Sequence, residues 1–244
     1  MNGSEVAIVT GGSRGIGRAV AERLASDGVA VAITYATSSE SAHEIVQTVE
    51  QAGGRAVAIR AAVADAGQMD ALFSQVESEF GGIDIVVTSA GIMRPALMVE
   101  ATDTDFSDHV SVNIRGTFNA LREAARRIRD GGRIITFSST TLALNAPGYG
   151  IYNATKGAVE GLTRVLAKEL GHRGVTVNAV APGPVETQLF LAGKTKADVE
   201  RLASLAPQHR IGQPVDIADA VALLVSADAG WINGQIVRVN GGVA

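Results

Sequence analysis

The sequence predicts an α/β protein built on a doubly wound sheet of about seven parallel strands, with helices on both faces. Short apolar segments alternate with amphipathic helical segments along the whole chain. The apolar segments are continuous runs rather than half-polar ones, which is typical of parallel strands buried on both faces. A glycine-rich loop joins the first strand to the first helix. These features together predict a Rossmann sandwich, and the length of 244 residues fits one domain spanning residues 1–244.

The expected elements follow from local signals. Paired glycines end helices at 53–54, 81–82 and 131–132, Gly28 ends the first helix, and Pro214 opens the last one. The segment 185–212 is irregular and contains Gly193, so we expect it to act as a substrate lid. The expected strands are 5–10, 29–35, 56–60, 83–88, 133–137, 175–180 and 235–240. The expected helices are 16–27, 40–52, 67–80, 103–129, one that carries Tyr152 and runs to 172, a patch at 197–205, and 214–226.

Composition excludes several classes of function. The chain has no cysteine, and its four histidines show no ligand spacing, so we expect neither disulfides nor a metal site. A net charge of −4 gives no reason to expect nucleic acid as a partner. No apolar run approaches the length of a membrane span, and no export signal precedes the first strand. We therefore expect a cytoplasmic protein without membrane contact.

The glycine loop predicts a dinucleotide-binding turn. Gly11, Gly15 and Gly17 follow the spacing G-x-x-x-G-x-G between a strand and a helix. Glycines there allow a tight turn and let a pyrophosphate approach the amino end of the helix. The alternative is an ordinary turn, but the loop lies at the first strand-to-helix junction of a parallel sheet, where the nucleotide reading is favoured.

The residues after the second strand favour NADP(H) over NAD(H). A carboxylate at this place would bind the ribose 2′-hydroxyl and repel a 2′-phosphate. The chain has no acid between Thr34 and Ser38, and Arg14 in the glycine loop is placed to face the phosphate. The alternative is that Arg14 only faces solvent.

Tyr152 and Lys156 predict a site that delivers a proton. They are four residues apart, so they share one face of a helix, and Ser139 at the end of the preceding strand is expected beside them. A neighbouring ammonium favours the phenolate, so we expect Lys156 to lower the pKa of Tyr152. Tyr152 would then exchange a proton with a carbonyl or alcohol oxygen near neutral pH. Taken alone, the pair also fits an exposed helix surface.

Together these motifs resemble the short-chain dehydrogenase/reductase family over nearly the whole chain. Residues 10–17 are similar to its TGxxxGxG loop, and Ser139, Tyr152 and Lys156 to its Ser–Tyr-x-x-x-Lys site. Asn113 resembles the fourth catalytic member, which in the family supports a water linking the lysine to solvent. The resemblance implies that Tyr152 is the acid/base, that Lys156 also holds the nicotinamide ribose, and that Ser139 binds the substrate oxygen. The alternative for Asn113 is a bond to its own helix backbone.

The resemblance also implies the rest of the nucleotide site. Two positions depart from the family: Ser89 where an asparagine is common, and Ala62 where an aspartate is common near the adenine. At Ala62 we expect only backbone contacts with the adenine. The implied cofactor contacts are Gly11, Ser13, Arg14, Gly15, Ile16, Gly17, Tyr35, Thr37, Ser38, Ala62, Val63, Ser89, Ala90, Gly91, Tyr152, Lys156, Pro182, Gly183, Val185 and Thr187.

The side chains expected around the substrate are mostly uncharged, which suits a ketone or a β-keto ester better than a polyanion. They are Met93, Pro95, Ser139, Thr141, Leu142, Asn145, Tyr149, Val185, Gln188 and Phe190. Among family members, the 3-oxoacyl-(acyl-carrier-protein) reductases resemble the chain most. An acyl carrier protein is therefore a candidate partner, with Arg129 and Arg173, supplemented by Arg126 and Arg127, as candidate docking residues. A solvated helix end explains these arginines equally well.

Family members commonly form tetramers through the helices that carry Asn113 and Tyr152. Gly157, Ala158 and Gly161 would allow close helix approach, so the resemblance implies a homotetramer. The leading hypothesis is reduction of a ketone or 3-oxoacyl thioester by NADPH. The alternatives left open are an NAD-dependent alcohol, sugar or steroid dehydrogenase working oxidatively, and a non-catalytic NADP-binding sensor.

Overall fold

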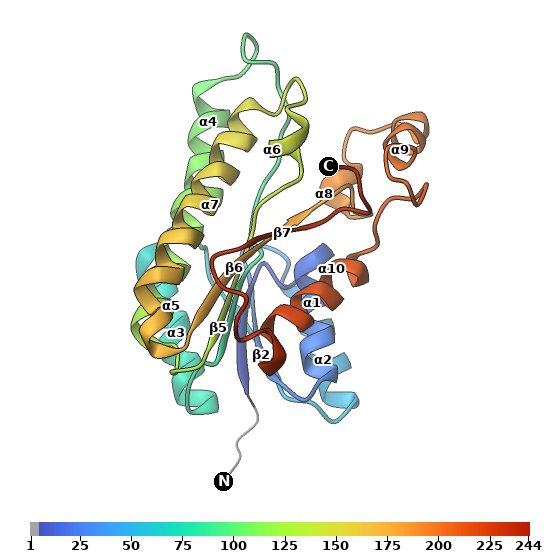
Figure 1. Ribbon diagram of the computed structural model, residues 1–244. Helices are drawn as coiled ribbons and strands as arrows, with labels where there is room; N and C mark the ends of the chain where they lie inside the picture. The colour runs from blue at the N-terminus through green and yellow to red at the C-terminus, as the bar shows by residue number, and fades with distance from the viewer. Residues whose placement is uncertain (1–4) are drawn as a thin grey trace.

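The computed structural model describes residues 5–244, which form one seven-stranded parallel sheet between two layers of helices. The strand order is β3-β2-β1-β4-β5-β6-β7 (Figure 1). The strands β2 and β3 therefore lie on one side of β1, and β4 to β7 lie on the other side. The strands are β1 Val6–Thr10, β2 Ala30–Tyr35, β3 Ala56–Arg60, β4 Ile85–Thr88, β5 Arg133–Phe137, β6 Thr176–Pro182 and β7 Ile236–Val239. The predicted fold class is confirmed.

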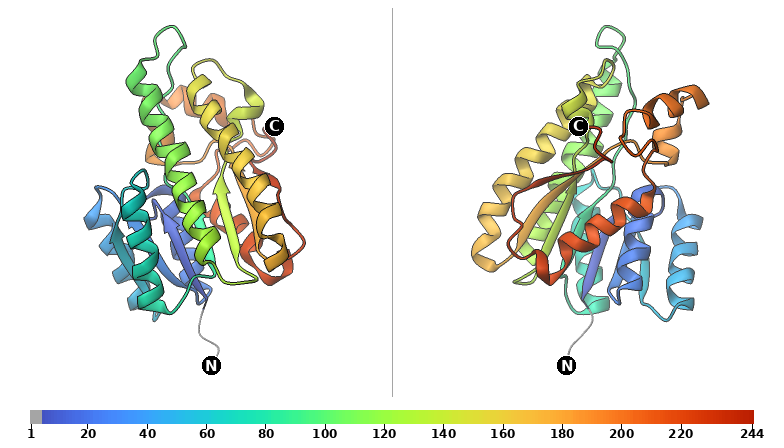
Figure 2. Two further views of the ribbon diagram at one scale, coloured as in Figure 1. Left: turned by 90° about the vertical axis from the view of Figure 1, so that its left-hand side faces the viewer. Right: turned by 45° about the vertical axis from the view of Figure 1, so that its right-hand side comes forward.

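The helices lie on opposite faces of the sheet (Figure 2). One layer contains α1 Gly15–Ser26, α2 Ser39–Gln51 and α10 Pro214–Val225. The other contains α3 Ala66–Phe80, α4 Asp103–His109, α5 Gly116–Arg127 and α7 Gly150–Leu170. Short helices α6 Thr141–Leu144, α8 Gln188–Leu191 and α9 Lys196–Ala203 lie in connections, and 3-10 turns cover Gly171–Arg173 and Ala227–Ala229.

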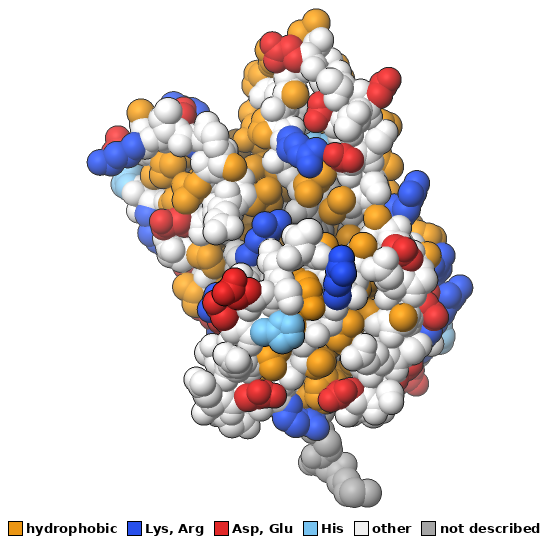
Figure 3. Space-filling view, turned by 180° about the vertical axis from the view of Figure 1, so that it is seen from behind, with side chains coloured by type: hydrophobic (Ala, Val, Ile, Leu, Met, Phe, Trp, Pro, Cys, Tyr) orange, Lys and Arg blue, Asp and Glu red, His pale blue; other side chains and the backbone are white. Residues whose placement is uncertain are grey.

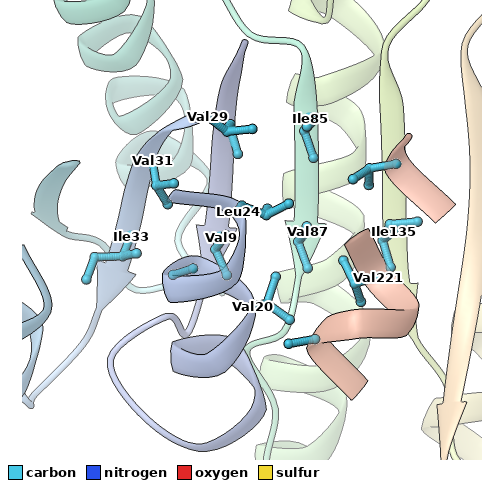
Figure 4. Packing of buried hydrophobic residues seen from close by; sticks show 14 of the residues in the cluster. Val9, Val20, Leu24, Val29, Val31, Ile33, Ile85, Val87, Ile135 and Val221 are labelled. Atoms are coloured by element: carbon cyan, nitrogen blue, oxygen red, sulfur yellow. The ribbon is translucent and has the colours of Figure 1, made fainter. Parts of the chain in front are cut away.

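Two apolar cores, one on each face of the sheet, hold the layers together. In the first core, Val20 and Leu24 of α1 and Val221 of α10 pack on β1, β4 and β5 (Figure 4). In the second, Phe73 of α3 and Leu121 of α5 pack on the other face. Burying one such side chain contributes about 1.5–3 kcal/mol, so the apolar strand runs of the sequence are the main source of sheet stability.

The predicted helix over residues 103–129 differs from the structure in one respect. The helical path is continuous, but Val110–Arg115 forms a π-helix between α4 and α5. The π segment contains Asn113. A π turn inserts one extra residue, which local propensity does not reveal, and such turns frequently occur at functional sites. No helix within residues 5–244 is long and apolar enough to cross a bilayer.

Candidate active site

The glycine loop packs closely against the ends of two strands. The backbone N–H of Gly11 donates to Thr34 Oγ1 of β2 at 3.1 Å, and Ala90 N–H donates to Thr10 Oγ1 at 3.3 Å. Gly11 has φ +65°, and a Cβ on it would lie 2.8 Å from Ala90 Cα. A Cβ on Gly17 would overlap the Gly11 carbonyl oxygen. The glycines are therefore required by the turn itself, which presents the amino end of α1 at the carboxyl edge of the sheet.

A hollow of about 450 Å³ lies beside the glycine loop. Arg14 and Ser38 both line it, which brings the two sequence segments proposed to bind a 2′-phosphate to one place. The remaining lining residues are Ser13, Gly15, Arg18, Ala19, Glu22, Ser41, Glu186, Thr187, Gln188 and Pro214. Arg14 is exposed and has no ion-pair partner among residues 5–244, whereas Arg18 is paired with Glu22 at 2.8 Å.

The other predicted nucleotide contacts follow β2, β3, β4 and β6, so the sheet brings them to the same edge. Two details differ from expectation. The Ala62 N–H donates to Gln68 Oε1 at 2.9 Å, so this backbone group is already bonded within the protein. The Val185 side chain is only 4% exposed and packs in the core, which leaves little of it for the contact with substrate that the sequence predicts. Sequence alone did not reveal Gln68, because its partner is six residues away in a turn.

Tyr152, Lys156 and Ser139 meet where β5 ends and α7 begins. The Lys156 ammonium lies 5.5 Å from the centroid of the Tyr152 ring and donates to the Phe137 carbonyl oxygen at 2.8 Å. Ser139 Oγ accepts hydrogen bonds from the Thr141 hydroxyl at 2.9 Å and the Thr141 N–H at 3.2 Å. The three functional groups therefore converge as predicted, with the serine hydroxyl oriented by Thr141.

The prediction that Lys156 lowers the pKa of Tyr152 is not supported. Burial raises the pKa of Tyr152 to about 12, with a hydrogen bond from Ser139 acting in the opposite direction and the charge of Tyr149 adding to the rise. Burial also lowers the pKa of Lys156 to about 8. Loss of hydration disfavours both charged forms, and in this structure that effect outweighs the attraction between them. The phenol is therefore protonated at neutral pH.

Asn113 joins three parts of the site through its carboxamide. Its Oδ1 accepts from Ile92 N–H at 2.9 Å, and its Nδ2 donates to the Ile92 carbonyl at 3.0 Å and to Thr155 Oγ1 at 3.1 Å. The alternative reading, a bond to its own helix backbone, is wrong. A Cβ on Gly91 would lie 3.4 Å from Asn113 Oδ1 and 3.9 Å from Lys156 Nζ, so Gly91 leaves open the space between them. Thr155 was not predicted, although its place three residues after Tyr152 is a spacing at which threonine bonds back to the helix.

A hollow lies between two projecting parts of the molecule (Figure 3), and the predicted substrate contacts Gln188 and Phe190 belong to α8 in one of them. One part carries α8 and α9, and the other carries α4 and the loop that contains Met98 (Figure 3). Both carry exposed apolar side chains. They are Leu97, Met98, Val99 and Leu144 on one side, and Leu189, Leu191 and Leu205 on the other. Leu142 and Ser139 also line a second cavity of about 490 Å³ with Glu160, Ala181, Ile236 and Arg238.

The arginines considered for carrier docking are paired inside the protein. Arg129 donates to both Asp84 carboxylate oxygens at 3.1 and 3.2 Å, and Arg173 donates to Asp130 at 2.7 Å. Arg126 and Arg127 both pair with Glu123. Arg129 lies next to the amino end of β4, whereas Tyr152 lies at the carboxyl end of β5. These four arginines are therefore engaged in ion pairs within the chain.

A doubly wound parallel sheet with a glycine-rich first turn and a tyrosine, lysine and serine at its carboxyl edge defines a nucleotide-dependent dehydrogenase or reductase. The family model described as enoyl-(acyl carrier protein) reductase matches residues 11–244. A short-chain type dehydrogenase/reductase of Picea abies is 42% identical over 98% of this chain and 92% of its own. The chain belongs to the short-chain dehydrogenase/reductase family.

Two further relatives are similar over their full length. The 3-oxoacyl-(acyl-carrier-protein) reductase FabG of Staphylococcus aureus is 40% identical, over 100% of this chain and 99% of its own. The crystal structure of a short chain dehydrogenase from Burkholderia cenocepacia in complex with NADP superposes with a TM-score of 0.93. It is 40% identical and covers 99% of this chain and 98% of its own. The family resemblance that the sequence motifs indicated is confirmed.

Proposed function

We propose that this protein reduces a ketone or 3-oxoacyl carbonyl to a secondary alcohol with a hydride from NADPH, Tyr152 giving the proton. The observation that carries the proposal is the convergence of Tyr152, Ser139 and Lys156 beside the nucleotide edge of the sheet. A bound NADPH would supply the hydride from its nicotinamide. Ser139 is placed to donate a hydrogen bond to the carbonyl oxygen, which stabilises the negative charge that develops there.

In the proposed reduction, Tyr152 gives a proton to the alkoxide that forms when hydride reaches the carbonyl carbon. Burial raises the pKa of its phenol to about 12, so the proton to be transferred is present at neutral pH. A panel of carbonyl compounds tests the proposal: a 3-oxoacyl thioester, a β-keto ester and aryl ketones, each followed by loss of NADPH absorbance. Oxidation of alcohols with NAD as the sole activity would contradict it.

We propose a substrate of low charge. Exposed apolar side chains lie on both projecting parts, Leu97 and Met98 before α4 on one and Leu189 and Leu191 of α8 on the other. We propose that residues 185–212, including α8 and α9, act as a lid over this substrate. A carrier-bound thioester remains a candidate substrate because the Staphylococcus aureus relative is named for that carrier. This candidate rests on the similarity to that relative and not on the paired arginines Arg126, Arg127, Arg129 and Arg173. The cytoplasmic location expected from the sequence remains a prediction.

Arg14→Ala is expected to weaken NADPH selectively. The guanidinium is exposed and unpaired at the hollow shared with Ser38, where it is placed for a charge-assisted bond to a 2′-phosphate. Losing such a bond costs about 1.5–3 kcal/mol, so the KM for NADPH should rise about tenfold or more, and the KM for NADH should stay the same. Steady-state kinetics with both nucleotides measure the difference. Arg18→Ala, in the same hollow but already paired with Glu22, is the matched control and should change the ratio less.

We also propose that the protein is a homotetramer joined through α5 and α7. Added Cβ atoms on Gly157 and Gly161 meet nothing, Val165 is 58% exposed, and Phe118 of α5 is 44% exposed. Val165→Asp should therefore dissociate the assembly, because it places a charge at an apolar contact. Light scattering after gel filtration measures the mass. Ala71→Asp, at an exposed position of α3, should leave the mass unchanged, and a monomeric unsubstituted protein would contradict the proposal.

A further inference from the structure

His109, at the end of α4, is fully buried, and both of its ring nitrogens have backbone partners. Nδ1 lies 2.7 Å from the carbonyl oxygen of Asp105, and Nε2 lies 3.2 Å from the backbone nitrogen of Arg94. A carbonyl oxygen only accepts a hydrogen bond, and a backbone amide only donates one. The ring therefore donates from Nδ1 to the Asp105 carbonyl and accepts through the Nε2 lone pair from the Arg94 amide.

Within residues 92–96, the backbone amides of Ile92, Arg94 and Ala96 each donate a hydrogen bond to an acceptor outside this segment. Arg94 is the middle one of the three. The amide of Ile92 donates to Asn113 Oδ1, and that of Ala96 donates to the Gly148 carbonyl, each at 2.9 Å. Asn113 and His109 are four residues apart on the helical path, and they accept from amides two residues apart in the segment 92–96. The helical path therefore holds this segment at two successive points.

The same segment connects the helical path to the catalytic turn. Gly148, which accepts from Ala96, lies just before α7, and the ring of Tyr149 lies 6.4 Å from that of Tyr152. Met93 and Pro95, two of the predicted substrate contacts, lie between the bonded residues 92, 94 and 96. A shift of the segment would therefore move these two predicted substrate contacts relative to Tyr152.

We propose that His109 is a positioning residue that fixes the segment 92–96, and thereby the substrate hollow, through the Arg94 amide. The effect on substrate depends on the proposed function, whereas the effect on the segment does not. The Arg94 side chain makes a second contact with α4, an ion pair with Asp108 at 2.7 Å. Because both side chains are about half exposed, this ion pair contributes little to holding the segment. The hydrogen bond from the Arg94 amide to the buried His109 ring is therefore the main link between α4 and the segment.

Hydrogen exchange of backbone amides, followed by NMR on the whole protein without nucleotide, tests the proposal directly. In the unsubstituted protein the Arg94 amide should exchange at least about tenfold more slowly than the amide of Val99, which is 90% exposed in the following loop. Equal exchange at the two amides would overturn the proposal without any substitution.

Two substitutions test separately the two hydrogen bonds that the His109 ring makes. His109→Gln keeps an acceptor near the place of Nε2, and His109→Asn keeps a polar group only near the place of Nδ1. We expect exchange at Arg94 to be about tenfold faster in the asparagine variant and nearly unchanged in the glutamine variant. Asp108→Asn is the matched control and should leave the Arg94 amide protected. Equal acceleration in both His109 variants would mean that the ring only fills space.

The kinetic readout distinguishes positioning from catalysis. With the ketone reduced best, His109→Asn should raise KM several-fold, with kcat within about twofold, and His109→Gln should restore KM. A loss of kcat with unchanged KM, or no difference between the two variants, would overturn the proposal. If the unsubstituted protein reduces no carbonyl compound, the proposed function fails, and the exchange measurements still decide the role of His109.

Discussion

Tyr152→Phe is expected to abolish turnover while leaving the fold and nucleotide binding in place. The substitution removes one oxygen atom, that of the buried phenol hydrogen-bonded to Ser139, which carries the proton to be given. A positioned proton donor contributes about 10²–10⁴-fold to rate, so kcat should fall about 10³-fold. Loss of NADPH absorbance measures turnover, and NADPH fluorescence measures binding, which should change less than about threefold because the ring remains.

Tyr149→Phe is the comparison for this substitution. The ring of Tyr149 lies 6.4 Å from that of Tyr152, and the chemical change is the same. We expect it to cost less than about tenfold, since Tyr149 is a predicted substrate contact and the Lys156 ammonium lies against the ring of Tyr152. A Tyr152→Phe protein that keeps more than a tenth of its turnover would contradict the assignment of Tyr152 as the proton donor. If the protein were a nucleotide-binding sensor, both variants would behave alike.

Lys156→Met is expected to change activity and stability in opposite directions. Lys156 is 7% exposed, and burial lowers its pKa to about 8. At neutral pH its ammonium is therefore charged in a place where it is solvated less well than in water. A pKa lowered from 10.5 to about 8 corresponds to roughly 3 kcal/mol of destabilisation below pH 8. Methionine fills a similar volume without charge, and the unpaired Phe137 carbonyl offsets about 1 kcal/mol. The net gain in the free energy of unfolding should be about 2 kcal/mol at pH 7.

The pH dependence of this gain follows from the sign of the shift. The destabilisation caused by burying the charged Lys156 is present in full below its folded pKa of about 8. It decreases as pH rises toward 10.5, where the unfolded lysine also loses its proton. The stabilisation by Lys156→Met should therefore be seen at pH 7 and be absent near pH 10.5. Urea unfolding at both values measures it, while turnover should fall at least about 10²-fold. A variant less stable than the unsubstituted protein at pH 7 would contradict the assigned burial cost.

Above pH 10, Tyr152 acts on stability in the opposite direction. Its pKa is raised in the folded protein, so between pH 10 and about 12 the unfolded chain ionises first and the fold loses stability. Urea unfolding of Tyr152→Phe should show less loss over this interval than the unsubstituted protein. This difference separates the effect of the tyrosine from that of the lysine, which operates between pH 8 and 10.5.

The sequence by itself determined the layered fold, the glycine turn and the candidate catalytic pair Tyr152 and Lys156, because each depends on local spacing. Continuous apolar runs specify buried parallel strands, and a spacing of four residues places Tyr152 and Lys156 on one helical face whatever surrounds it. Only the tertiary structure decided the protonation of the site and the partners of its polar groups. The pKa values of Tyr152 and Lys156 depend on how much water the surrounding elements exclude, and local spacing carries no information about that. The same holds for Asn113 and His109, whose partners lie 21 and 15 residues away and are met only when α4 and its π segment pack against the chain after β4.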